Sequence, residues 1–252
     1  MKQFLFFVCF AMAMYGCDKA SNQTASAFAG GGTGAGGSLA RFTIVGNHLY
    51  TVDKQKLKVF DISNPAQANF IRSISVGFEI ETIYPFKDKL FIGSTSVVHI
   101  FSIADPASPQ KLSEAISPNV LRRCDPVVAK DTVAYATLRT NGACGGTQSI
   151  LAVYDIKDIA KPVQKNFANV TEPYGLGYSE TTLYVCDRLD GLVVFNIANA
   201  YNPVRVKNIK LTASQFIDVI PYGDILVCWL SNGLALYDIS NKQNPVLIKQ
   251  IS

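Results

Sequence analysis

The stretch Lys58-Val59-Phe60-Asp61-Ile62-Ser63 decides the fold, because it returns in altered form four more times along the chain. Each copy has an aromatic residue, then a short polar residue, then isoleucine. The other copies are His99-Ile100-Phe101-Ser102-Ile103-Ala104, Ala152-Val153-Tyr154-Asp155-Ile156-Lys157, Val193-Val194-Phe195-Asn196-Ile197-Ala198 and Ala235-Leu236-Tyr237-Asp238-Ile239-Ser240. The aromatic residues stand at positions 60, 101, 154, 195 and 237, so the steps between them are 41, 53, 41 and 42 residues. Such a regular period indicates a repeat architecture.

The sequence around each copy predicts a four-stranded unit. A second short apolar segment precedes each aromatic residue, as at residues 49–52 and 90–93. Proline follows the short polar residue by seven positions in the last four units, whereas the first unit has Ala68 there and Pro65 instead. In the second unit the predicted strands are residues 81–85, 89–93, 97–103 and 110–116, separated by turn-forming residues.

Four strands in about 40–45 residues are typical of a β-propeller blade. One such sheet cannot bury both of its apolar faces alone, so the blades must stack on one another. We therefore predict an all-β fold, a five-bladed β-propeller of four-stranded antiparallel blades. The expected blades cover about residues 41–77, 78–118, 119–171, 172–212 and 213–252. We expect the first blade to close the ring by packing against the fifth.

The pattern resembles the LVIVD repeat family over about residues 41–252. Asp61-Ile62-Ser63-Asn64-Pro65 and Asp238-Ile239-Ser240 with Pro245 match it best. Ser102 and Asn196 depart from the family's Asp, but both keep a short side chain that can bond its own backbone in a turn. The resemblance implies the propeller fold and an exported or cell-surface bacterial or archaeal protein. It implies no particular reaction, because most members have none assigned.

The first residues are typical of a targeting segment. Met1-Lys2-Gln3 gives a short positive start, and residues 4–16 form an apolar run that is too short to span a bilayer. Gly16-Cys17-Asp18 resembles the bacterial lipoprotein cleavage box, although Tyr15 is bulkier than that box usually has. We predict a lipoprotein signal peptide at residues 1–16 and a lipid on Cys17 that anchors the protein to a membrane. The alternative is an ordinary secretory signal that is cut elsewhere.

A Gly/Ser-rich stretch separates the predicted lipid from the folded domain. Residues 30–38 contain six glycines and no large side chain to bury, so we predict a flexible tether over residues 17–38 and a propeller over residues 39–252. The predicted location is the cell envelope, with the outer membrane or the cell surface favoured over the inner membrane.

Export places the remaining cysteines where disulfides persist. The third unit is longer than the others because of a loop at residues 139–149, which contains Cys144. Cys124 begins the innermost strand of the same unit, so we predict that a Cys124–Cys144 disulfide pins this loop. Cys186 and Cys228 stand 42 residues apart. We take them as equivalent positions about 10 Å apart, which makes them free, buried thiols.

The innermost strands of a propeller line its central channel. Their starts carry the candidate binding residues Glu79, Glu81, Asp125, Tyr174 and Asp218. Arg139 in the long loop and Trp229 in the fifth unit complete the set, because loops carry binding residues more often than strands do. One interpretation is that these side chains gather at one mouth of the channel and bind a cation or a polar ligand. The interpretation that we favour is that they are solvated strand ends and turn formers.

Composition and motifs exclude several functions. The chain has 23 Lys and Arg against 19 Asp and Glu, with no basic cluster, so nucleic-acid binding is not expected. No catalytic motif and no metal-ligand spacing stands out, and we predict no cofactor and no metal. The prediction is a non-enzymatic binding or scaffold module for a protein or glycan partner. The alternative is a hydrolase or lyase that uses channel-mouth carboxylates on a polysaccharide or a small polar substrate.

Overall fold

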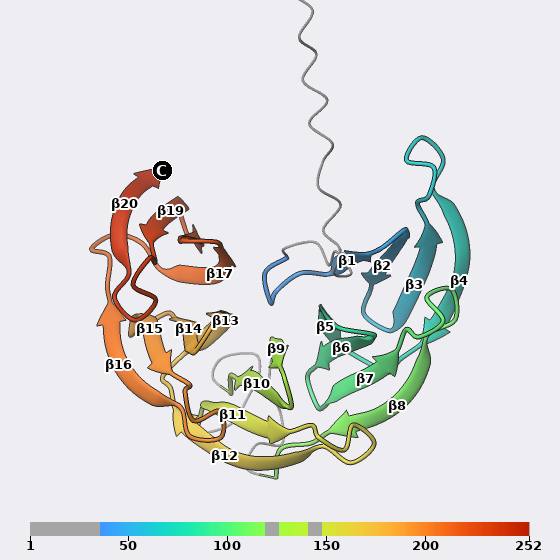
Figure 1. Ribbon diagram of the computed structural model, residues 1–252, viewed down its shortest axis with the longest axis horizontal. Coiled ribbons are helices and arrows are strands. Elements are labelled where there is room, and N and C mark those ends of the chain that lie inside the picture. Colours follow the sequence, from blue (N-terminus) through green and yellow to red (C-terminus); the bar gives the residue numbers. More distant parts are fainter. Residues whose placement is uncertain (1–35, 119–125, 141–147, 252) are drawn as a thin grey trace, which may run out of the picture. The chain divides into compact units, whose positions relative to one another are not determined.

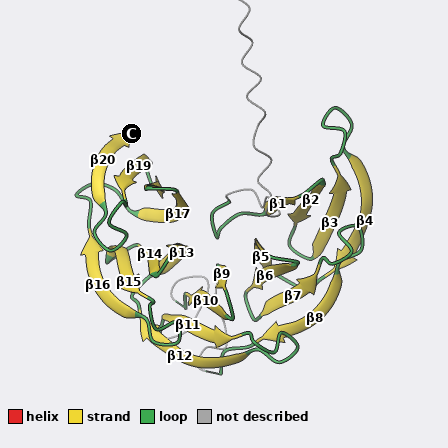
Figure 2. Cartoon of the chain, viewed as in Figure 1, coloured by secondary structure: helices red, strands yellow, loops and turns green. Residues whose placement is uncertain are grey.

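The computed structural model describes residues 36–118, 126–140 and 148–251, which all belong to one compact unit, residues 31–252. The described strands form five separate four-stranded antiparallel sheets, and each sheet takes four strands that are consecutive in the chain. The sheets follow one another around a common centre (Figures 1 and 2). This arrangement confirms the predicted all-β fold of five four-stranded blades. Within these described ranges, no helix is long and apolar enough to cross a membrane.

The strand bounds agree closely with the repeat. Blade 1 contains β1 (Phe42–Val45), β2 (His48–Val52), β3 (Lys56–Asp61) and β4 (Asn69–Ser75). Blade 2 contains β5 (Ile80–Phe86), β6 (Lys89–Ser94), β7 (Val98–Ser102) and β8 (Gln110–Ala115). Blade 3 contains β9 (Val127–Lys130), β10 (Val133–Leu138), β11 (Ile150–Asp155) and β12 (Val163–Asn169). Blade 4 contains β13 (Pro173–Ser179), β14 (Thr182–Asp187), β15 (Gly191–Asn196) and β16 (Val204–Ile209). Blade 5 contains β17 (Phe216–Tyr222), β18 (Ile225–Leu230), β19 (Gly233–Asp238) and β20 (Val246–Ile251).

The short polar residue of each repeat ends the third strand by bonding the turn that follows it. In every blade its side-chain oxygen accepts a hydrogen bond from the backbone N–H two residues later, at 2.7–3.2 Å. Ser102 and Asn196 make this bond as the three aspartates do, which confirms the role predicted for them. The recurring polar residue therefore specifies where the chain turns toward the outermost strand.

Each blade has a trailing face, toward the preceding blade, and a leading face, toward the next blade. Four hydrophobic clusters join leading to trailing faces, between blades 1 and 2, 2 and 3, 3 and 4, and 4 and 5. The repeated aromatic residue belongs to the trailing face, and in blades 2 to 5 it is at most 1% exposed: Phe101, Tyr154, Phe195 and Tyr237. The core is thus distributed between the blades, as stacked sheets require.

Tyrosines on the leading faces fasten three of these interfaces. Tyr50, Tyr135 and Tyr184 occupy the same place in their blades, one residue after the partner of the repeated aromatic residue. Each hydroxyl donates to a carbonyl in the turn before the outermost strand of the next blade, at 2.8, 2.8 and 2.7 Å respectively. Burial raises the pKa of all three phenols, to about 12 for Tyr50. A buried tie of this kind stabilises a fold by about 1 kcal/mol.

The expected packing of blade 1 against blade 5 is wrong for this structure. Among the described residues, no hydrophobic cluster joins these two blades, and Figure 1 shows an opening between β1–β4 and β17–β20. Phe60, the repeated aromatic residue of blade 1, is only partly buried because no blade covers it. Residues 36–40 lie at the centre of the unit, where they bond the inner strands of blades 2, 4 and 5, as described below.

Cys186 and Cys228 are free and buried, as predicted. They are not equivalent, however. Leu183 and Leu226 are the equivalent positions, because each pairs with the repeated aromatic residue of its blade. Cys186 comes three residues after Leu183, whereas Cys228 comes two residues after Leu226. Cys186 therefore lies on the leading face of blade 4 and Cys228 on the trailing face of blade 5, in one cluster. Burial raises the pKa of both thiols, which keeps them protonated and unreactive. Cys17 and the predicted Cys124–Cys144 pair lie outside the described residues.

Candidate functional site

Four of the candidate binding residues lie at one end of the blades, where the first strands begin and the second strands finish. Glu79 directly precedes β5, and Tyr174 is the second residue of β13. Arg139 follows β10, and Trp229 is near the end of β18. Asp125 lies outside the described residues. We call this end the upper mouth. The strand topology therefore places these four residues at one end of the blades, but they do not form a single cluster and Asp218 is not among them.

Arg139 and Tyr174 form the best-defined pair at the upper mouth. The Arg139 guanidinium carbon lies 4.0 Å from the centre of the Tyr174 ring, a cation–π contact between blades 3 and 4. The Tyr174 carbonyl accepts a hydrogen bond from Thr137 Oγ1 at 2.6 Å, which fixes β13 against β10. Burial raises the pKa of Glu81, and the nearby Arg139 opposes this rise. This part of the mouth is therefore held together by a cation–π contact and a hydrogen bond between blades 3 and 4.

Arg188 lies beside this pair and was not among the predicted binding residues. Its Nε donates to Gln215 Oε1 at 2.9 Å, and its Nη1 lies 3.3 Å from Glu172 Oε1. Its position depends on Asp187, which is fully buried. The Asp187 carboxylate accepts four backbone N–H bonds at 2.8–3.0 Å, two from the connection that enters blade 4 and two from the turn after β14. Asp187 thus holds two loops together and directs the next residue, Arg188, over the mouth.

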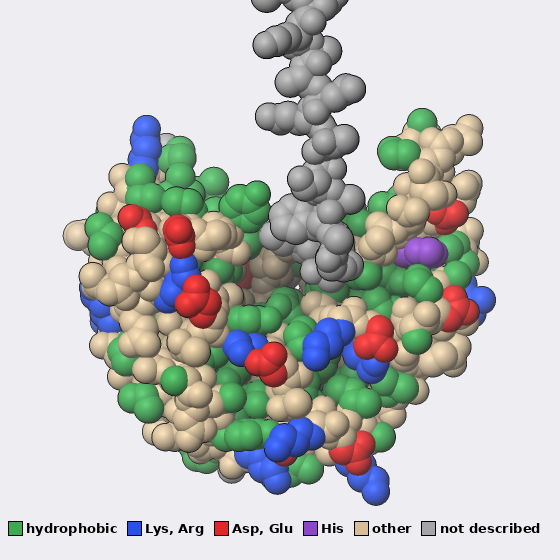
Figure 3. Space-filling model, in the orientation of Figure 1, with side chains coloured by type: hydrophobic (Ala, Val, Ile, Leu, Met, Phe, Trp, Pro, Cys, Tyr) green, Lys and Arg blue, Asp and Glu red, His purple; other side chains and the backbone are tan. Residues whose placement is uncertain are grey.

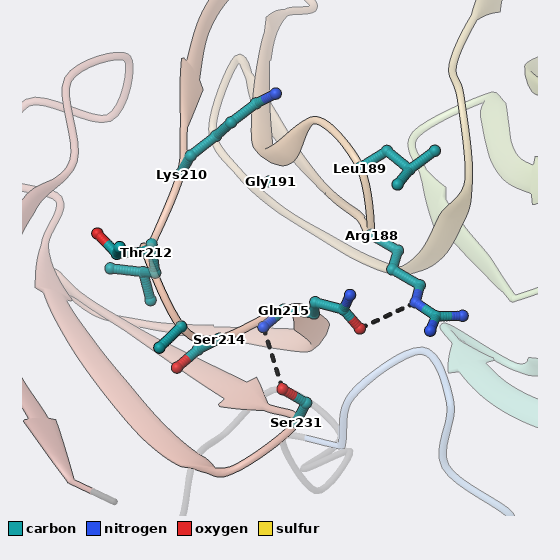
Figure 4. Close-up of a pocket in the computed structure, with 10 residues that line it drawn as sticks. Arg188, Leu189, Gly191, Lys210, Thr212, Ser214, Gln215 and Ser231 are labelled. Atoms are coloured by element: carbon teal, nitrogen blue, oxygen red, sulfur yellow. Dashed lines mark hydrogen bonds between the residues drawn. The ribbon is translucent and has the colours of Figure 1, made fainter.

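A polar pocket of about 420 Å³ opens between blades 4 and 5 next to Arg188 (Figure 4). We call it the blade 4–5 groove. Its ten lining residues include two cations, Arg188 and Lys210, and no acidic residue. Hydroxyl and amide groups supply the remaining polar lining: Thr212, Ser214, Gln215 and Ser231. Each cation also has an acidic neighbour outside the lining, Glu172 at 3.3 Å from Arg188 and Asp190 at 3.8 Å from Lys210. The groove therefore offers mainly hydrogen-bond donors to a hydroxylated or anionic ligand.

The groove is preformed by hydrogen bonds and by one close backbone approach. Gln215 N donates to Ser231 Oγ at 3.1 Å, and Gln250 Nε2 donates to Ser214 Oγ at 2.9 Å. Gly191 has a φ of +82°, and a Cβ there would overlap the Ile209 carbonyl. Glycine is required at this position because the turn of blade 4 contacts the backbone that leads into blade 5.

A second pocket, of about 400 Å³, lies between blades 1 and 2 at the upper mouth. Glu79 lines it and accepts a hydrogen bond from Thr95 Oγ1. His99 lies deeper, with its Nδ1 3.1 Å from Glu114 Oε1. Burial lowers the pKa of His99, so the imidazole is neutral near pH 7. Glu79 thus borders a pocket that Tyr174 does not line, and the two do not form one shared site. No group of three metal-ligating side chains occurs in the portion of the chain that the structure describes.

Asp218 is not at the mouth but in the interior, only 7% exposed. It accepts hydrogen bonds from Ser38 Oγ and Leu39 N, each at 3.1 Å, and Ser38 Oγ in turn accepts one from Leu176 N at 2.7 Å. The prediction that Ser38 belongs to a flexible tether is therefore wrong, since this side chain is 1% exposed. Gly37 is needed for close approach, because a Cβ there would overlap the Asp218 carboxylate. Asp218 fixes the entering chain and does not face a ligand.

Trp229 also lies away from the groove. It is 52% exposed on the leading face of blade 5, opposite Leu234 on β19. The local sequence does not distinguish this position from a mouth-facing one, because both lie at the same strand end. Basic and acidic side chains are interspersed on the face that Figure 3 shows. Ion pairs between sequence neighbours also occur, at Lys89–Asp88 and Lys130–Asp131.

Comparison with known sequences identifies the repeat. A sequence model of the LVIVD repeat matches residues 36–76 and 227–252, in blades 1 and 5. The predicted resemblance to this family is confirmed in these two segments. Comparison with curated protein sequences gives no match.

Solved structures of the same fold share little sequence with this chain. A protein from Lactobacillus plantarum has a TM-score of 0.68 at 13% identity, over 82% of this chain and 73% of that one. The periplasmic gluconolactonase PpgL of Pseudomonas aeruginosa has a TM-score of 0.61 at 15% identity, over 84% and 66%. AztD of Citrobacter koseri has a TM-score of 0.57 at 13% identity, over 83% and 63%. The chain therefore spans about two thirds of the length of these proteins, and the similarity shows the propeller fold alone.

Proposed function

We propose that this LVIVD-repeat propeller is a non-enzymatic binding module that takes an acidic glycan in the blade 4–5 groove. The observation that carries the proposal is the lining of the groove, with two cations, three hydroxyl side chains, one amide and no carboxylate. Sugar hydroxyls exchange hydrogen bonds with such groups, and a uronic acid carboxylate pairs with Arg and Lys. The Tyr174 ring, under Arg139 and beside Arg188, extends the site toward the channel.

The pairing of the mouth carboxylates supports binding over catalysis. A glycosidase needs one carboxylic acid and one carboxylate that face the same bond from opposite sides. Glu172 is paired with Arg188, and Glu81 lies near Arg139 and Arg41. The blade 4–5 groove itself has no acidic lining residue, so its own lining supplies neither a carboxylic acid nor a carboxylate base. A hydrolase or lyase is therefore the less supported alternative.

The cell envelope is the proposed place of action. Residues 1–16 and Cys17 have the pattern of a lipoprotein signal and its acylated cysteine, and one protein of similar fold is periplasmic. We propose that a lipid on Cys17 holds the propeller at the outer membrane or the cell surface, where acidic polysaccharides occur.

Isothermal titration calorimetry with hexamers of galacturonic acid tests the proposed ligand, and neutral maltohexaose serves as the comparison. We expect binding of the acidic hexamer only. Arg188→Gln and Lys210→Gln should each weaken it at least tenfold, because each removes a cation from the groove. Lys54→Gln, which removes an exposed cation from blade 1, should leave binding unchanged.

The same samples test the alternative function. No shortening of the acidic hexamer is expected after long incubation with the protein, as followed by mass spectrometry. Cleavage would show an enzyme rather than a binding module. Equal affinity for the neutral hexamer, or no effect of Arg188→Gln and Lys210→Gln, would refute the acidic groove as the site.

A further inference from the structure

The four interfaces between consecutive blades follow one rule: a leading face packs on a trailing face. In blade 4 the leading face consists of Tyr184, Cys186, Leu192 and Val194, and all four are fully buried against blade 5. The same rule leaves two faces without a blade. They are the leading face of blade 5 and the trailing face of blade 1.

The leading face of blade 5 is apolar and exposed. Strand pairing assigns to it the counterparts of the four buried residues of blade 4: Val227, Trp229, Leu234 and Leu236. Trp229 is 52% exposed and Leu234 is 41% exposed. Ile251 lies opposite Leu234 on β20 and is 49% exposed. Hydrophobic side chains are visible along this border of the molecule in Figure 3.

The trailing face of blade 1 has the complementary character. Phe60 and Leu49 occupy the places of Phe101 and Leu90, which are completely buried in blade 2. Phe42 and Phe70 lie on the same face and are 61% and 59% exposed. The rings of Phe60 and Phe70 pack edge to face, with their centres 5.6 Å apart. This face resembles the trailing faces that receive a neighbouring blade elsewhere in the molecule.

Residues 36–40 keep these two faces apart within one chain. Ser38 and Leu39 bond Asp218 in β17, and the Ala40 carbonyl accepts a hydrogen bond from Ile83 N in β5 at 2.8 Å. The segment therefore connects the inner strands of blades 5 and 2 across the centre, where closing blades would have to meet. Because Ser38 is 1% exposed and fully hydrogen-bonded, removing it to close the ring is costly.

We propose that a second copy of this chain covers these faces. The leading face of blade 5 in one copy packs on the trailing face of blade 1 in another, by the same rule that joins consecutive blades within each chain. A second copy is the occupant that the structure favours, because each chain carries both members of a complementary pair. The contact is head to tail, so copies join in a closed pair or continue in a row. This assembly is independent of any ligand in the blade 4–5 groove.

Light scattering during size-exclusion chromatography tests the assembly on the full chain purified in detergent, with only the protein mass counted. We expect the mass of at least two chains. Trp229 is the single tryptophan, so its fluorescence reports directly on the face in question. Its emission should shift to shorter wavelength as the concentration rises, because a second copy shields it from water.

Two substitutions make the test specific. Leu234→Glu disrupts the leading face and Phe42→Glu disrupts the trailing face, and each variant alone should associate at least tenfold more weakly. An equimolar mixture should form a pair with one intact contact, since each variant keeps the face that the other lacks. Val206→Glu is the matched control, because Val206 is an exposed apolar residue on β16, outside the opening.

Three results would overturn the proposal. A single-chain mass with exposed Trp229 emission would show that no copy covers the face. A single-chain mass with shielded emission would show that blade 1 closes on blade 5 within the chain. Assembly that persists in both variants, or no recovery on mixing them, would place the contact elsewhere.

Discussion

Asp218→Asn should change the pH dependence of stability in a direction opposite to that of an ordinary surface aspartate. Burial among Ser38, Leu39 and Val219 raises the pKa of Asp218 from 3.8 to about 6, and the hydrogen bonds from these residues only partly oppose the rise. The folded chain therefore holds the proton more tightly than the unfolded chain does. The protonated Asp218 side chain therefore stabilises the fold fully below pH 4, and this stabilisation is lost as the pH rises through 6.

The size of this effect follows from the pKa difference. One pKa unit corresponds to about 1.4 kcal/mol, so a rise of about two units is worth up to about 3 kcal/mol of unfolding free energy. Asparagine does not titrate and keeps an acceptor for Ser38 or Leu39. The unfolding free energy of wild type minus that of Asp218→Asn should therefore fall by about 2 kcal/mol between pH 4 and pH 7.

Urea unfolding at half-unit pH steps, followed by Trp229 fluorescence, measures this difference directly. Taking the difference cancels the titration of all other groups. Asp238→Asn is the matched control, because the backbone N–H of Ser240 lowers the pKa of Asp238. The stability from Asp238 is present above its unfolded pKa and is lost as the pH falls, so the difference should have the opposite sign. A wild-type minus Asp218→Asn difference that is flat with pH would refute the burial of an ionisable carboxyl at this position.

Three further predictions concern single contacts. Tyr184→Phe removes the hydroxyl that bonds the Lys242 carbonyl, and it should lower the unfolding free energy by about 1 kcal/mol in urea titrations; an unchanged value would show that the tie contributes nothing. Cys17→Ala should leave the circular dichroism spectrum unchanged but release the protein from membranes, and retention in the membrane fraction would count against lipidation. Mass spectrometry of unreduced tryptic peptides should link Cys124 to Cys144, whereas two free thiols would remove the proposed pinning of the long loop.

The strands could be predicted well because their signals are local and repeated. Residues 81–85, 89–93, 97–103 and 110–116 were expected in blade 2, and β5 to β8 begin and end within one residue of these bounds. The turn-bonding role of Ser102 followed from its place beside the repeated aromatic residue. Because one position of the repeat has the same role in all five units, the units can be aligned with one another within a single sequence.

The candidate site was predictable only in part, because its residues become neighbours through three different blades. Tyr174 and Arg139 could be assigned to the upper mouth from their places in the repeat. Arg188 was not recognised, since Asp187 and Asp190 around it give the local pattern of a solvated hairpin turn. Its contact with Gln215 links blade 4 to the start of blade 5. No local sequence pattern reports that contact.

The central segment escaped prediction for a related reason. Gly37 and Ser38 look like the end of a Gly/Ser linker, and the partner of Ser38 is Asp218, 180 residues away. Glycine serves two different purposes in the same run of sequence. In a linker it favours a disordered chain, because ordering glycine costs more conformational entropy than ordering any other residue. At Gly37 the missing side chain allows the backbone to approach a carboxylate. Composition alone cannot separate these two purposes.

Ring closure depends on the angle between blades, which the number of repeats does not determine. Each angle is set by the side chains that separate two sheets, and the buried tyrosines at positions 50, 135 and 184 fix three of these separations by reaching the next blade. Blade 5 has Val227 at this place, which is too short to reach a following turn. Blade 2 has Phe91 at this place and still packs on blade 3, so an interface can form without the hydroxyl tie. The spacing of two sheets therefore depends on all the side chains between them, and the repeat pattern does not report that spacing.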